Sequence, residues 1–118
     1  MTPKKYAYCK IFVNDPSPDE IATRVARALG TPAANRVIEQ SGLIVEVRRN
    51  IGTGGHRDFL EWPVTVEIEC ADGSSSSPMV PVVDRILRYL WSTETPSVAA
   101  CPFEDELPWG GGMELLAE

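Results

Sequence analysis

The sequence predicts a ferredoxin-like α+β domain, in which a four-stranded antiparallel sheet carries two helices on one face. Two observations lead to this fold class. Strand and helix patterns follow one another in the order βαββαβ, and 118 residues with 43% hydrophobic side chains are enough for one core. We therefore expect one domain over residues 1–101, followed by an acidic, glycine-rich C-terminal tail over residues 102–118.

The first half of the chain predicts a strand, a helix and a second strand. Residues 6–13 alternate aliphatic or small side chains with aromatic and charged ones, which is typical of a strand. Ser17 can cap a helix that ends at Gly30. Residues 33–42 are ambiguous between a strand and a helical turn. Alternation returns over residues 43–49, where we expect the second strand.

The second half predicts a strand, a helix and a short last strand. Residues 64–70 have the cleanest period-two pattern in the chain. Pro81 is tolerated only in the first turn of a helix, so the second helix is expected to begin near Ser77. Pro96 ends that helix, and residues 97–101 form a short apolar strand candidate.

This element order leads us to expect the strand order 4-1-3-2, with the first and third strands central and parallel. Cys101 should then lie near Cys9, whereas Cys70 should lie at the far end of the sheet. The sheet face away from the helices would mix aromatic and charged side chains, namely Tyr8, Lys10, Phe12, Ile44, Glu46, Arg48, Thr65, Glu67 and Glu69.

The charge and the cysteines exclude several function classes. A net charge of −6 argues against nucleic-acid binding, because backbone phosphates require clustered cations. An odd number of widely spaced cysteines, without a CxxC pair, favours neither a disulfide framework nor a zinc site, and we expect no metal and no cofactor. Because no signal-peptide pattern and no membrane-spanning apolar run occur, we expect a cytoplasmic protein without a membrane partner.

A glycine-rich loop between the second and third strands is the first candidate site. The loop contains the sequence GTGGHRD over residues 52–58. Glycines near arginines can cradle a phosphate or carboxylate, although this sequence is neither a Walker A motif nor a dinucleotide fingerprint. A plain hairpin connection is the alternative. The residues that would bind the anion are Arg48, Arg49, Gly54, Gly55, His56 and Arg57.

The acidic C-terminal stretch is the second candidate site. Phe103, Leu107 and Trp109 would fasten it to the domain and direct the three carboxylates outward, where they would meet a partner or remain solvated. Consecutive acids on an extended chain diverge, which argues against a metal site. The proposed partner contacts are Glu104, Asp105, Glu106 and Trp109.

Four stretches together resemble a group of small, uncharacterised bacterial proteins. They are Tyr6–Phe12 (YAYCKIF), Arg48–Asn50, Phe59–Trp62 and Cys101–Pro108 (CPFEDELP). The resemblance to this group implies no particular activity. By type, small acidic bacterial proteins of this kind are often immunity proteins of toxin systems.

We therefore expect a non-enzymatic protein-binding domain, in particular an immunity protein that binds and occludes a bacterial toxin. No nucleophile motif such as GxSxG occurs, and no cysteine has a visible base partner. An acidic surface would speed association with a basic toxin. The alternative is a small anion- or ligand-binding ferredoxin-like domain or enzyme that uses the glycine-rich loop. Homodimer formation through the outer sheet face fits either hypothesis.

Overall fold

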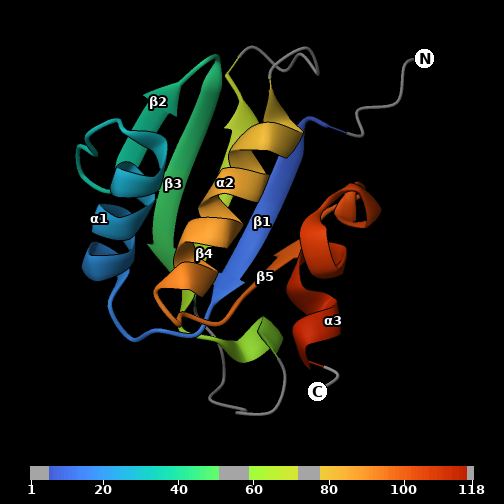
Figure 1. Cartoon of the computed structure of the whole chain (residues 1–118). Coiled ribbons are helices and arrows are strands. Elements are labelled where there is room, and N and C mark those ends of the chain that lie inside the picture. Colours follow the sequence, from blue (N-terminus) through green and yellow to red (C-terminus); the bar gives the residue numbers. More distant parts are fainter. Residues whose placement is uncertain (1–5, 51–58, 72–77, 117–118) are drawn as a thin grey trace.

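The computed structural model describes residues 6–50, 59–71 and 78–116. Within these residues the chain is a mixed α+β fold, with one antiparallel sheet of five strands and three α-helices (Figure 1). None of the helices in the described ranges is both long and apolar enough to cross a membrane.

The sheet has the strand order β2-β3-β4-β1-β5, and all four neighbouring pairs are antiparallel. Along each strand, side chains point alternately into and away from the core. The strands are β1 (Tyr8–Val13), β2 (Val37–Gln40), β3 (Leu43–Arg49), β4 (Val64–Cys70) and β5 (Ser97–Ala100).

Two long helices cover one face of the sheet (Figure 1). Helix α1 (Pro18–Leu29) begins where the Ser17 hydroxyl accepts a hydrogen bond of 3.1 Å from the Glu20 amide, as the capping pattern predicted. It ends at Gly30, whose left-handed φ of 68° lets the chain leave the helix. Helix α2 (Met79–Ser92) begins after Pro78, and α3 (Met113–Leu116) is a single turn near the C-terminus.

Strand β2 is a fifth strand where four were predicted, and it occupies the stretch that the sequence left ambiguous. A two-residue turn joins β2 to β3, with φ values of 52° at Ser41 and 80° at Gly42. Positive φ at both central residues defines the hairpin turn that matches the natural twist of a sheet. A second turn of this kind, with φ values of 53° at Asn35 and 65° at Arg36, brings the chain into β2.

The two central strands, β1 and β4, are antiparallel, so the expected parallel pairing is wrong. Helix α1 carries the chain back so that β1 and β3 run in the same direction, and β4 lies between them as the hairpin partner of β3. Antiparallel pairing places Cys70 at the end of the sheet where β1 begins, because its amide donates a hydrogen bond of 3.1 Å to the Ala7 carbonyl. The expected separation of Cys70 from Cys9 is therefore also wrong.

The core lies between the sheet and the two long helices. Every inward side chain of β1, including Cys9, Ile11 and Val13, has no exposed surface. The opposite face of the sheet is partly covered as well, because the Phe12 ring packs edge-on against Phe59 at 5.4 Å. The outer face is thus covered by Phe59 at the end where β1 finishes.

Candidate protein-binding site

The residues from Cys101 to Leu116, which we call the C-terminal segment, pack onto the domain instead of extending from it. Phe103 is completely buried in the core, and Leu107 is buried beside it. The ring of Phe103 lies 5.5 Å from that of Tyr6, just before β1. Phe103 and Leu107 therefore fasten the segment to the domain.

The three predicted acidic contacts form a 3₁₀ turn over Glu104–Glu106. The Glu104 carboxylate accepts a hydrogen bond of 3.3 Å from the Cys101 amide, and the Glu106 carboxylate accepts one of 2.6 Å from the Tyr6 hydroxyl. Asp105 and Glu106 are exposed, and Glu104 is half-buried. Glu106 therefore links the segment to Tyr6 in the domain, Glu104 stabilises the turn within the segment, and the turn as a whole faces outward.

After this turn, three glycines let the segment run back along β5. A Cβ atom at Gly112 would come within 2.4 Å of the Ser97 carbonyl oxygen, and one at Gly111 within 3.0 Å of the Ala99 carbonyl oxygen. Only residues without a Cβ can approach a strand this closely. Trp109 precedes them with a left-handed φ of 57° and is 56% exposed, so it projects outward. The expectation that Trp109 fastens the segment is therefore wrong.

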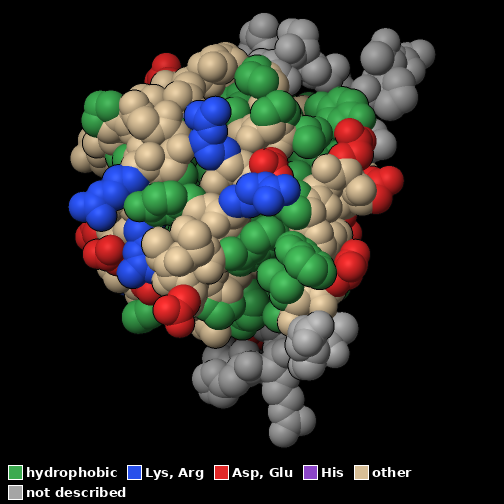
Figure 2. Space-filling view, in the orientation of Figure 1, with side chains coloured by type: hydrophobic (Ala, Val, Ile, Leu, Met, Phe, Trp, Pro, Cys, Tyr) green, Lys and Arg blue, Asp and Glu red, His purple; other side chains and the backbone are tan. Residues whose placement is uncertain are grey.

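A groove of about 400 Å³ opens where the C-terminal segment meets the end of α2. Its apolar walls come from three parts of the chain that are distant in sequence, and Leu115 and Leu116 in α3 remain 38% and 45% exposed. Apolar side chains are exposed over this part of the molecule in Figure 2. The groove is lined by Trp62, Trp91, Glu94, Thr95, Pro96, Ser97, Gly112, Leu115 and Leu116.

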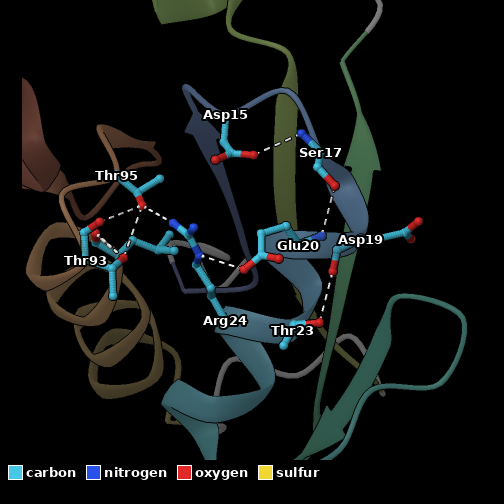
Figure 3. A network of polar contacts seen from close by, with 9 residues as sticks. Asp15, Ser17, Asp19, Glu20, Thr23, Arg24, Thr93 and Thr95 are labelled. Atoms are coloured by element: carbon cyan, nitrogen blue, oxygen red, sulfur yellow. Dashed lines mark hydrogen bonds and ion pairs between the residues drawn. The ribbon is translucent and has the colours of Figure 1, made fainter.

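Polar contacts hold one wall of the groove in position. The Arg24 guanidinium reaches from α1 to the buried Thr95 hydroxyl and also contacts the Glu20 carboxylate at 3.2 Å (Figure 3). The Trp91 indole N–H donates a hydrogen bond of 3.0 Å to the Ser97 carbonyl. The turn between α2 and β5 is thereby bonded to both long helices, so this wall of the groove is held in position.

The acidic turn and the groove lie at opposite ends of β5. Tyr6 and Cys101, which contact the acidic turn, lie where β5 ends, whereas Pro96 and Ser97 line the groove where β5 begins. The predicted contacts Glu104, Asp105 and Glu106 are thus brought together with one another but not with the groove. Trp109 follows the acidic turn in sequence and precedes α3.

The groove residues were not identified from the sequence. In the sequence, Trp91 lies in the apolar stretch of the second helix, and Trp62 follows the glycine-rich loop, far from Trp91 and from the C-terminus. The available signal was the apolar pair Leu115 and Leu116 in a stretch otherwise rich in glycine and carboxylates. Apolar residues in a solvated tail lack a core to bury them, so such a pair indicates either docking or a binding surface.

The outer sheet face is a second surface that carries carboxylates. Glu46 on β3 lies directly opposite Glu67 on β4, and the Tyr8 hydroxyl donates a hydrogen bond of 3.1 Å to the Glu67 carboxylate. Partial burial, and then the negative charge of Glu67, raise the pKa of Tyr8 to about 12. Arg48 lies 3.8 Å from Glu67 and offsets part of this charge.

Only part of the alternative anion site can be placed. Arg48 and Arg49 are exposed at the end of β3. The predicted partners Gly54, Gly55, His56 and Arg57 lie outside the described residues. The anion hypothesis therefore stays a prediction.

Within the described residues, no group of three or more His, Cys, Asp or Glu side chains is arranged to hold a metal ion. Comparisons of the chain with protein-family models, with curated proteins and with solved structures gave no match.

Proposed function

We propose that this chain is a non-enzymatic protein-binding domain, and that the C-terminal segment and its groove form the binding surface. The groove is the observation that carries the proposal. It is lined by Trp62 and Trp91, one of its walls is held by hydrogen bonds, and it is bordered by the exposed Leu115 and Leu116. Pockets of this kind receive an apolar anchor residue from a protein partner, and such anchors supply most of the binding free energy.

The charge distribution supports a basic partner. The C-terminal segment contains four carboxylates and no lysine or arginine, and the chain has a net charge of −6. Figure 2 shows carboxylates along the edge where this segment lies, whereas basic and acidic side chains are mixed over the two long helices. A negatively charged surface speeds the encounter with a positively charged partner and gives it a preferred orientation.

We propose further that the partner is a basic bacterial toxin, which would make the chain an immunity protein that acts in the cytoplasm. In this proposal a toxin side chain enters the groove where β5 begins, while Asp105 and Trp109 form separate contacts with the toxin, Asp105 at the opposite end of β5. We also propose that the fold is ferredoxin-like, with β2 added at one edge. The strand order β3-β4-β1-β5 and the two helices on one face support that assignment.

The test is an isothermal calorimetric titration of the purified chain with the purified product of the neighbouring gene. We expect binding, and we expect a double substitution, Leu115→Ser with Leu116→Ser, to weaken it at least about tenfold, which corresponds to roughly 1.4 kcal/mol. Absence of binding by the unaltered chain would remove the toxin proposal.

A matched pair of variants separates local contact from overall charge. The first replaces Glu104, Asp105 and Glu106 by Gln, Asn and Gln, and the second replaces Glu39, Glu46 and Glu69 on the outer sheet face by Gln. Each removes three negative charges. If the acidic turn contacts the partner, the first variant dissociates faster than the second at physiological salt. Equal effects would assign these acids to long-range steering alone.

A further inference from the structure

Two of the cysteines at one end of the sheet, Cys9 and Cys101, lie opposite each other on neighbouring strands. Lys10 on β1 faces Ala100 on β5, and continuing this register by one residue places Cys9 opposite Cys101. At the other end of the ladder, the Asn14 amide donates a hydrogen bond of 2.9 Å to the Pro96 carbonyl. Because hydrogen-bonded pairs alternate along an antiparallel ladder, Cys9 and Cys101 form a non-hydrogen-bonded pair.

Non-hydrogen-bonded pairs bring the two backbones closest together, with Cα atoms about 4.5 Å apart. Disulfides span Cα separations of roughly 4.4–6.8 Å, so this position permits a bond without a large backbone movement. The side chains of two directly opposed residues also lie on the same face of the sheet, and Cys101 packs against the core that contains Cys9. The Cys70 thiol instead donates to the Tyr6 carbonyl at 3.6 Å.

Exposure gives the two thiols different roles. Cys9 has no exposed surface, whereas Cys101 is half-buried and can be reached by a small molecule from solvent. Hydrogen bonds from the Cys9 thiol and from the Phe103 backbone lower the pKa of Cys101. The hydrogen bond to Cys101, together with burial, raises the pKa of Cys9.

We propose that Cys9 and Cys101 are a redox-active pair that forms a reversible intramolecular disulfide when the protein meets a small peroxide. The Cys101 thiolate attacks one peroxide oxygen and the O–O bond breaks, which leaves a sulfenic acid on Cys101 and releases hydroxide or alkoxide. The Cys9 sulfur then attacks the Cys101 sulfur. The S–O bond breaks, and its hydroxyl leaves as water with the Cys9 proton.

In this reaction the two thiols are oxidised by two electrons and the peroxide is reduced. A thiol reductant returns the pair to its starting state through a mixed disulfide. Cys101 is the residue at which β5 ends and the C-terminal segment begins. The disulfide would therefore fix the start of that segment to the central strand β1. This inference is independent of the protein-binding proposal.

The experiment treats the full 118-residue chain, first reduced, with equimolar hydrogen peroxide, and then blocks free thiols and maps peptides by mass spectrometry. We expect a loss of two hydrogens in the intact mass, a Cys9–Cys101 peptide link, and reversal by dithiothreitol. The variant Cys70→Ala is the matched control and should form the same link. The variant Cys9→Ala should accumulate a sulfenic acid on Cys101 that dimedone traps.

Three results would overturn the proposal. They are a link that involves Cys70, a dimer joined through Cys101, or oxidation of Cys101 to sulfinic acid in the unaltered chain without any link. Because the peptide map is made on the unaltered chain, the test remains decisive even if Cys9→Ala does not fold.

Discussion

Replacement of Gly112 by alanine tests whether the C-terminal segment is held on β5 by close backbone contact. The Cβ atom of the alanine would lie 2.4 Å from the Ser97 carbonyl oxygen and 3.1 Å from the Trp91 ring. The residue also has a φ of +103°, a conformation that side chains with a Cβ rarely adopt. Both effects oppose the docked position of the segment.

The two effects can be estimated separately. A left-handed backbone conformation costs a residue with a Cβ roughly 1–2 kcal/mol. Forcing extra volume into a packed site costs about 1–3 kcal/mol more, since here the nearest atom belongs to the backbone and not to a flexible side chain. We therefore expect Gly112→Ala to lower the free energy of unfolding by about 3 kcal/mol. For a domain of this size the melting temperature should fall by roughly 12 °C.

Gly30→Ala is the matched control, because Gly30 has a φ of +68° and a Cβ there would meet no atom within 4 Å. It carries the conformational cost without the contact. Urea titrations of both variants give the difference directly, and we expect Gly112→Ala to be the less stable by at least 1 kcal/mol, near the lower end of the overpacking range. Stabilities that agree within about 0.5 kcal/mol would refute the close contact with Ser97.

Three further predictions follow from other contacts. Phe103→Ala should destabilise the fold by about 3–5 kcal/mol in a urea titration, and a loss below about 1 kcal/mol would contradict its role as the anchor. Ser17→Ala should cost about 1 kcal/mol by removing the cap of α1, whereas the nearby exposed Thr23→Ala should stay within about 0.5 kcal/mol. Tyr8 should titrate near pH 12 by phenolate absorbance, and Glu67→Gln should lower that midpoint. Because folding raises the pKa of Tyr8 from 10.0, its contribution to stability is complete below pH 10 and is lost as the pH rises towards 12.

Elements with one buried face could be predicted closely from the sequence. The strands Leu43–Arg49 and Val64–Cys70 were expected with the bounds that the structure has, because a one-residue slip would move every core side chain to the wrong face. The caps at Ser17 and Gly30 defined α1 in the same way. These signals are local, so they can be recognised without knowledge of the tertiary structure.

Features that depend on distant partners could not be predicted. Strand β2 has only four residues, and among its side chains only Ile38 is buried. Its hairpin needs Ser41 in a left-handed conformation, which serine does not favour in isolation. The groove likewise exists only because Trp62 and Trp91 come together beside α3 in the folded chain.

The interior position of β1 in the sheet has a consequence for the order of folding during synthesis. β1 is made before the other four strands of this sheet, yet its neighbours are β4 and β5, which are made much later. The hairpins β2–β3 and β3–β4 pair strands that are successive along the chain, so they can form first. Until Ser97–Ala100 emerge, one edge of β1 has no strand to pair with, and its apolar residues depend on chaperones or on the nascent hairpins for cover.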